Sequence, residues 1–225
     1  MAEKFNSEPE LILNSVHFWG ENKAFFDPQT NERQLIITGT PEGAGFVAGQ
    51  NRLDNCLNQP DTAFGQIYTG SYLRTIYQSS EDMKKLFSEL NKKVNGAQVD
   101  VLAYSFGVQS FAEFVGVNPE YHQNIRSVVL VSPSIGGKSI QNSFFFMKPL
   151  YPNPTEYLRK VSPLFKKLTA EKKLVLVTAS HDEYVNNQFV TNTFKQQFPD
   201  IEIRTRNGTH AINADDVKTA FDLIK

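Results

Sequence analysis

The chain has 225 residues, and its 23 Lys and Arg against 24 Asp and Glu leave a formal charge of −1 at pH 7. This balance, without a basic stripe, argues against a nucleic-acid-binding protein. The single cysteine, Cys56, cannot form an internal disulfide or a cysteine-rich zinc site. No apolar run reaches the roughly 18–20 residues of a membrane-spanning helix, and the polar first ten residues lack the apolar core of a signal peptide. We therefore expect one cytoplasmic globular domain over residues 1–225, without stable membrane insertion, metal or other cofactor.

Short apolar strands alternate with helical segments along most of the chain. The predicted strands are residues 10–19, 34–38, 72–78, 98–104, 126–131, 173–178 and 201–205. The predicted helices are residues 46–58, 79–96, 106–115, 184–198 and 213–225. Several strands are continuously apolar rather than alternating with polar residues, which is typical of strands buried on both faces. The pattern predicts an α/β fold with a mainly parallel central sheet and helices on both of its faces.

The segment Ala103-Tyr104-Ser105-Phe106-Gly107 joins a predicted strand to a predicted helix. A serine forced into such a sharp turn needs small residues two positions before and two positions after it, because the chain packs closely there. Ala103 and Gly107 meet that requirement. Ser105 is therefore a candidate nucleophile. The alternative is that Ser105 only caps the helix of an ordinary strand-to-helix turn.

A serine hydroxyl becomes a useful nucleophile when a base takes its proton and an acid orients that base. His210 lies between the last predicted strand and the last predicted helix, at the sheet edge where Ser105 should be exposed. Asp182 follows the apolar strand 173–178 and is the candidate acid, with Glu183 as the second choice. The alternative for Asp182 is a cap on the helix that follows it.

At this point the residues resemble the α/β-hydrolase superfamily. The chain order Ser105, Asp182, His210 is that family's order of nucleophile, acid and base. Residues 179–185 are similar to its Gly-x-x-Asp-x-x-Val pattern, with Ala at the first place. The Asn-Gly-Thr-His stretch that ends at His210 is similar to its Gly-x-His loop. The resemblance covers about residues 10–225.

The turn Thr38-Gly39-Thr40-Pro41 resembles the family's His-Gly-x-Pro oxyanion turn, with Thr38 in place of His. The resemblance implies an oxyanion hole made by the backbone N–H groups of Thr40 and Phe106. It also implies that Gly39 and Tyr104, which flank these groups, belong to the substrate-binding residues. Thr38 and Ala103 stand where the family pattern has His and Gly. These two differences weaken the assignment to a subfamily more than the assignment as an enzyme.

Residues 134–169 interrupt the alternation of strands and helices and are rich in Phe, Tyr and Pro. Insertions at this place in the family often form a lid over the nucleophile, so we predict a small aromatic lid here. Its Phe144, Phe145 and Phe146 are candidate substrate contacts, and the alternative is that these rings only pack the lid on the body. Asn153-Pro154 is typical of a helix start.

The resemblance implies a serine hydrolase, of carboxylesterase or thioesterase type, that cleaves a small ester or thioester through an acyl-enzyme intermediate. The same scaffold also supports acyl transfer and lyase chemistry. A further alternative is a catalytically weak, hydrolase-like protein that binds a small ligand. The expected partner is therefore a small-molecule ester or acyl compound and not a nucleic acid, and the sequence leaves the oligomeric state open.

Overall fold

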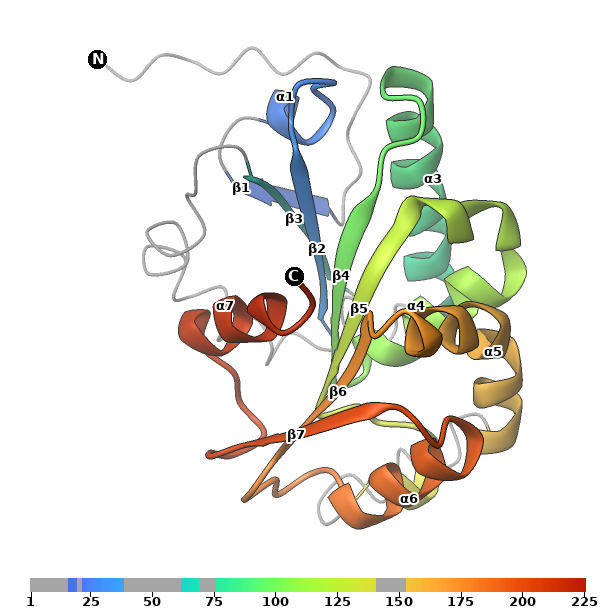
Figure 1. Ribbon diagram of the computed structural model, residues 1–225, viewed down its shortest axis with the longest axis vertical. Helices are drawn as coiled ribbons and strands as arrows, with labels where there is room; N and C mark the ends of the chain where they lie inside the picture. Colours follow the sequence, from blue (N-terminus) through green and yellow to red (C-terminus); the bar gives the residue numbers. More distant parts are fainter. Residues whose placement is uncertain (1–15, 20–21, 39–61, 69–75, 141–152) are drawn as a thin grey trace.

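A computed structural model describes residues 16–19, 22–38, 62–68, 76–140 and 153–225. In this part of the chain seven strands form one sheet in the order β1-β3-β2-β4-β5-β6-β7 (Figure 1). Their bounds are β1 Val16–Trp19, β2 Glu32–Thr38, β3 Thr62–Tyr68, β4 Val99–Tyr104, β5 Ile125–Val131, β6 Leu174–Ala179 and β7 Glu202–Arg206. Only the β1–β3 pair is antiparallel. The predicted mainly parallel sheet is confirmed.

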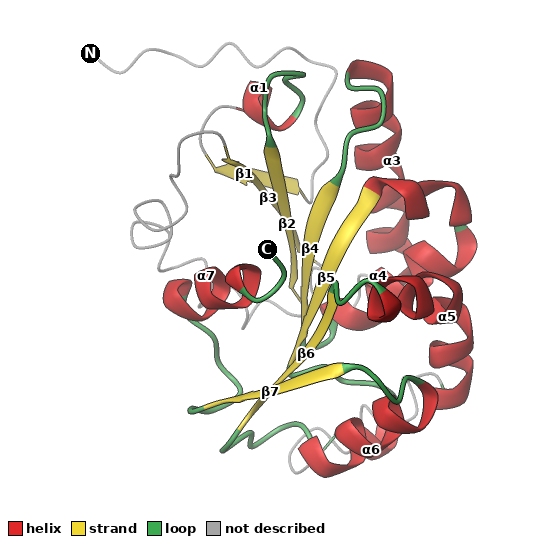
Figure 2. Cartoon of the chain, viewed as in Figure 1, coloured by secondary structure: helices red, strands yellow, loops and turns green. Residues whose placement is uncertain are grey.

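Helices cover both faces of the sheet, as predicted (Figure 2). Their bounds are α1 Asn22–Phe25, α3 Ile76–Lys93, α4 Gly107–Val117, α5 Pro154–Ala170, α6 Asn187–Gln197 and α7 Ala214–Asp222, with 3₁₀ turns at Pro119–Asn124 and Gly137–Ser139. Helices α3, α4, α5 and α6 lie on one face, and α7 lies on the other. None of the helices described here is long and apolar enough to cross a membrane.

Strand β4 shows why the predicted strands are continuously apolar. All six of its residues are buried, and successive side chains point to opposite faces of the sheet. Val101 and Ala103 pack into the core beneath α3, α4, α5 and α6, whereas Leu102 and Tyr104 pack into the core beneath α7. Each strand with two covered faces therefore needs apolar residues at both alternate sets of positions.

Strand β3, Thr62–Tyr68, was not predicted, because it contains a glycine and the polar Gln66. The side chain of Gln66 is fully buried, and its amide donates a hydrogen bond to the Thr38 hydroxyl on β2 at 3.2 Å. A buried polar side chain is tolerated in a central strand when a neighbouring strand provides such a partner. Local apolarity therefore did not reveal this strand.

Four further predictions need correction or fall outside the described residues. The predicted strand 72–78 is wrong for residues 76–78, which begin α3, and its earlier residues are not described. The helix predicted to start at Ser79 begins three residues earlier, at Ile76. The predicted helix 46–58 falls outside the described residues, as do residues 10–15 of the first predicted strand. The other boundaries agree to within about three residues.

The C-terminal part of the predicted lid belongs instead to the helical layer of the fold. Residues 154–170 form α5, which begins directly after Asn153 as predicted and connects β5 to β6. Its apolar side is buried in the core beside α4, with Tyr157 and Phe165 almost fully covered. The lid prediction is therefore wrong for α5, because this helix packs on the sheet. Residues 141–152, with the three candidate phenylalanines, lie outside the described residues.

The N-terminus of α4 approaches the backbone of β2 very closely at Gly107. A Cβ placed on Gly107 would overlap the carbonyl oxygen of Ile37 and lie 2.7 Å from its carbonyl carbon. Backbone atoms of a central strand cannot move aside as a flexible side chain can. The small residue that the sequence pattern required two positions after Ser105 is thus needed for packing against β2.

We expect Gly107→Ala to lower the free energy of unfolding by about 1–3 kcal/mol or more, as overpacking of a rigid core does. Gly96→Ala is the matched control, because its φ of +71° strains an alanine but a Cβ there meets no atom within 4 Å. That control should cost only about 1 kcal/mol. Equilibrium urea unfolding measures both, and equal losses would contradict the close approach at Gly107.

Candidate active site

Ser105 directly follows β4 and adopts a left-handed backbone conformation, with a φ of +52°. Its N–H donates to the Val131 carbonyl at 2.9 Å, and its own carbonyl accepts hydrogen bonds from the N–H groups of Val108 and Ser134 at 3.3 Å. A non-glycine residue pays about 1–3 kcal/mol for such a conformation, so the surrounding contacts must impose it. The turn presents the Ser105 side chain at the carboxyl edge of the sheet.

A continuous chain of hydrogen bonds links the three residues that the sequence singled out. The Ser105 hydroxyl lies 2.8 Å from Nε2 of His210. The other ring nitrogen of His210, Nδ1, lies 3.0 Å from both carboxylate oxygens of Asp182. The structure thus brings the serine, the histidine and the aspartate into hydrogen-bonding contact from the ends of three different strands.

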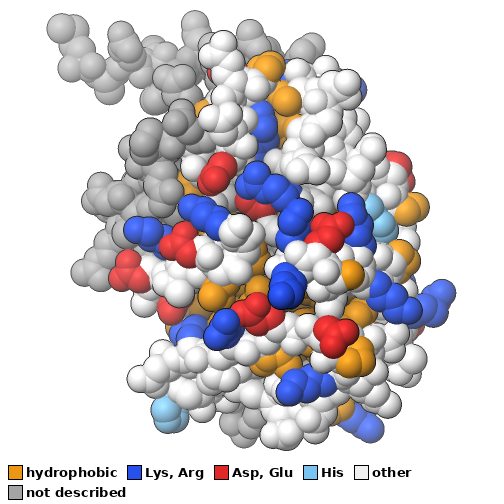
Figure 3. Space-filling view, viewed as in Figure 1, with side chains coloured by type: hydrophobic (Ala, Val, Ile, Leu, Met, Phe, Trp, Pro, Cys, Tyr) orange, Lys and Arg blue, Asp and Glu red, His pale blue; other side chains and the backbone are white. Residues whose placement is uncertain are grey.

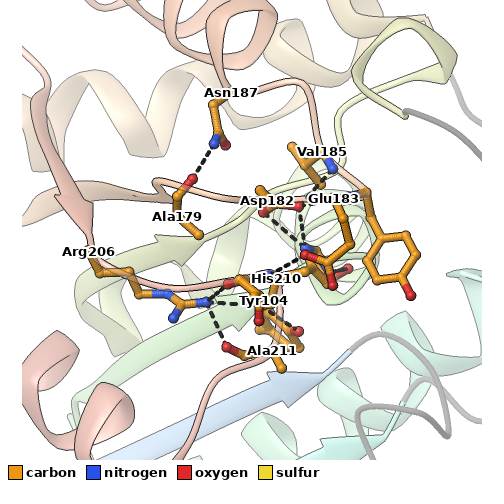
Figure 4. Close-up of polar contacts among 12 residues, drawn as sticks. Tyr104, Ala179, Asp182, Glu183, Val185, Asn187, Arg206, His210 and Ala211 are labelled. Carbon is orange, nitrogen blue, oxygen red and sulfur yellow. Dashed lines mark hydrogen bonds and ion pairs between the residues drawn. The ribbon is translucent and has the colours of Figure 1, made fainter.

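The Asp182 carboxylate is held ionised by its surroundings (Figure 4). Burial by itself raises its pKa, but the hydrogen bond and charge of His210 and the N–H of Val185 outweigh burial, so the pKa lies below its usual value. The backbone N–H groups of Tyr184 and Val185 donate to one carboxylate oxygen at 3.0 and 2.8 Å. These bonds resemble a helix cap, but they precede α6, whose cap is Asn186.

The loop of Asp182 and the loop of His210 are hydrogen-bonded directly to each other. The N–H of His181 donates to the Gly208 carbonyl at 2.9 Å, and the N–H of Gly208 donates to the Ser180 hydroxyl at 3.2 Å. The carboxylate of Glu183 accepts the backbone N–H of His210 at 3.0 Å. Glu183, the second choice for the acid, thus binds the histidine's backbone N–H, whereas Asp182 binds its ring.

Two tyrosine rings flank the imidazole of His210. The ring centroid of Tyr104 lies 5.2 Å from that of His210, and Tyr184 meets the imidazole edge-on at 5.3 Å. Tyr104 was predicted to contact substrate, but it is buried and its hydroxyl donates to the His210 carbonyl at 3.0 Å. Burial raises the pKa of Tyr104, so this hydroxyl remains a donor. Tyr104 thus supports the histidine loop.

The remaining predicted site residues are only partly described. Phe106 is described and precedes the first residue of α4, so its backbone N–H lies at the positive end of that helix. The positions Gly39, Thr40, Phe144, Phe145 and Phe146 lie outside the described residues. Within the described ranges, no group of three His, Cys, Asp or Glu side chains could hold a metal ion.

Arg206 is a site residue that the sequence did not reveal. It ends β7, and its guanidinium contacts the carbonyl groups of the histidine loop (Figure 4). It also lines a cavity of about 200 Å³ between the sheet and α7, together with Asp216 and apolar side chains of both. On the face in Figure 3, acidic and basic side chains are interspersed. The signal in the sequence is only its place before the histidine loop.

Similar structures identify the fold. Est1E from Butyrivibrio proteoclasticus matches 92% of this chain and 89% of its own with a TM-score of 0.56 at 15% identity. A lipase-esterase related protein from Clostridium acetobutylicum matches 93% of this chain and 98% of its own with a TM-score of 0.57 at 13% identity. The chain has the α/β-hydrolase fold.

A candidate dipeptidyl aminopeptidase IV from Bacteroides ovatus matches 92% of this chain with a TM-score of 0.60 at 16% identity. The chain spans only 32% of that protein's length. No family model matches the sequence, and no curated protein matches it either. Comparison of structures therefore finds a shared fold that comparison of sequences does not find.

The lowered pKa of Asp182 predicts how its contribution to stability depends on pH. Because the folded-state pKa lies below the ordinary value of about 3.9, the ionised carboxylate stabilises the fold above about pH 5 and loses this effect as the pH falls through the folded-state pKa. We expect Asp182→Asn to cost about 1.5–3 kcal/mol at pH 7, and the difference from the wild type to shrink below pH 4. Urea unfolding between pH 7 and pH 3 measures this difference in the free energy of unfolding.

The control for this measurement is Asp200→Asn, in the exposed turn before β7. It should leave the free energy of unfolding within about 0.5 kcal/mol of the wild type at every pH. A difference between wild type and Asp182→Asn that stays constant from pH 7 to pH 3 would contradict the role given to the ionised carboxylate.

Proposed function

We propose that this protein is a serine hydrolase that cleaves a small carboxylic ester or thioester through an acyl-enzyme intermediate. The observation that carries the proposal is the chain of contacts from Ser105 through His210 to Asp182, at 2.8 and 3.0 Å. These distances are the ones that proton transfer from a hydroxyl to an imidazole requires. The left-handed turn at Ser105 and the buried Asp182 add to this support.

In the acylation step, the Ser105 oxygen attacks the carbonyl carbon while its proton passes to Nε2 of His210. The imidazolium then donates that proton to the leaving alcohol or thiol as the bond to the carbonyl carbon breaks. A water molecule repeats the sequence on the acyl-enzyme and releases the acid. Asp182, ionised because its pKa is lowered, holds Nδ1–H and stabilises the positive charge that His210 acquires.

The oxyanion that forms on the carbonyl oxygen needs donors beside the nucleophile. The backbone N–H of Phe106 follows Ser105 directly and lies at the N-terminus of α4, where the helix dipole favours negative charge. We propose the N–H of Thr40 as the second donor, on the resemblance of its turn alone. Both donors are backbone groups, so the shape of the two turns matters more than their side chains.

The similar structure from Clostridium acetobutylicum, named as a lipase-esterase related protein, supports an ester as the substrate class. It does so by analogy of fold, which does not choose between hydrolysis and acyl transfer. Ester hydrolysis is preferred because it needs only water as the second substrate.

We expect Ser105→Ala to lower the turnover of p-nitrophenyl butyrate about 10⁶-fold, as removal of a triad nucleophile does. Wild-type protein should react covalently with a fluorophosphonate probe, and Ser105→Ala should not. Initial rates and mass spectrometry of the labelled protein measure the two effects. The matched control is Ser162→Ala on α5, which should keep the wild-type rate.

Three results would count against this proposal. Hydrolysis by Ser105→Ala at the wild-type rate would exclude Ser105 as the nucleophile. Wild-type protein that neither reacts with the probe nor hydrolyses the ester would instead identify a hydrolase-like binding protein. Faster release of product when an alcohol is added would assign acyl transfer, with the same three residues.

A further inference from the structure

Three consecutive carbonyl groups of the histidine loop converge on one guanidinium. Nη2 of Arg206 donates to the carbonyls of Thr209, His210 and Ala211, at 3.0 Å for His210 and 2.7 Å for Ala211. The loop lies between β7 and α7 and has no regular secondary structure. The three carbonyls of residues 209–211 thus share one side-chain donor. Arg206 gives the loop a fixed path past His210 (Figure 4).

The guanidinium is itself held in place. Its Nη1 lies 3.6 Å from the carboxylate of Asp216, and the Arg206 side chain is only 14% exposed. Asp216 forms a capping box with Asn213 at the start of α7, with reciprocal hydrogen bonds of 2.9 and 3.0 Å. Gly208 has a φ of +146°, and a Cβ on it would lie 2.9 Å from Nη1. The glycine thus leaves room for the guanidinium.

The backbone of His210 is fixed on both of its polar sides. Arg206 and Tyr104 donate to its carbonyl, each at 3.0 Å, and Glu183 accepts its N–H at 3.0 Å. The imidazole must stay 2.8 Å from Ser105, which comes from a different strand. Of these three partners, only Arg206 also donates to the carbonyls of the two neighbouring residues, Thr209 and Ala211. Its loss would leave three neighbouring carbonyls without this donor.

We propose that Arg206 is a positioning residue that sets His210 at proton-transfer distance from Ser105. It acts through the loop backbone and not on the substrate, because its contacts are with the three carbonyls and with Asp216. This proposal rests on the proposed serine hydrolase function. It predicts a loss of kcat and of serine reactivity with little change in KM, since a displacement of about 1 Å can slow a reaction 10²-fold.

The test compares Arg206→Met with Arg204→Met, in the wild-type background. Arg204 lies two residues earlier on the same strand and lines the same cavity, but it is exposed and pairs with Glu202 at 2.6 Å. We expect Arg206→Met to lower the rate constant of fluorophosphonate labelling and kcat for p-nitrophenyl butyrate about 10²-fold, with KM within about threefold. For Arg204→Met, the labelling rate constant, kcat and KM should all stay within twofold of the wild type. Melting temperatures are recorded for both variants.

A small guanidinium compound added to Arg206→Ala separates positioning from folding. The truncated side chain enlarges the existing cavity beside Asp216, so methylguanidinium can enter and donate to the same carbonyls. We expect it to restore the labelling rate about tenfold or more in Arg206→Ala, and to have no effect on Arg204→Met. If Arg206 had a purely structural role, Arg206→Ala would melt at a lower temperature. Its labelling rate would then not recover when methylguanidinium is added to the folded protein.

The possible outcomes are distinct. Wild-type rates of labelling and turnover in Arg206→Met overturn the positioning role and leave the proposed function intact. Wild-type protein that the probe does not label overturns the proposed function, and this proposal with it. If Arg206→Met does not fold, Arg206→Lys decides, because an ammonium does not reproduce the planar guanidinium; labelling within twofold of the wild type then overturns the proposal.

Discussion

The contact between the N-terminus of α4 and the backbone of β2 at Gly107 governs the geometry of the whole site. Only a residue without a Cβ allows the helix to start so close to Ile37. That close start forces the chain to reverse direction within the preceding two residues, and Ser105 takes the left-handed conformation. The strain is offset by hydrogen bonds from Ser105 to Val131 and from Ser134 to Ser105. The candidate nucleophile is therefore a consequence of packing.

The same turn distributes its neighbours between the two faces of the sheet. Ala103 faces the large helical layer, where a small side chain lets α4 pack closely, and Tyr104 faces α7. Tyr104 reaches the carbonyl of His210 from there, although the two residues are 106 positions apart in the chain. The strand that ends at Ser105 thus also supports the candidate base, from the opposite face.

The candidate acid and base lie on loops, and loops hold a geometry only when other groups fix them. Here the two loops fix each other through Ser180, His181 and Gly208. Arg206 then ties the histidine loop to the first turn of α7 through Asp216. The resulting network connects β4, β6, β7 and α7. A rigid sheet edge with interlocked loops is the kind of scaffold that nucleophilic catalysis needs.

The sequence by itself determined the order of strands and helices from β4 to α7, the strand-to-helix turn at Ser105, and the candidates Asp182 and His210. These features follow from apolar periodicity and from small residues, which act locally. It did not determine β3, whose buried Gln66 donates its amide to a residue of a neighbouring strand, or the place of α5 in the core. Only the tertiary structure decided the supporting roles of Tyr104, Glu183 and Arg206. Their partners are backbone groups, which carry no signature in the sequence, and folding alone brings them within reach.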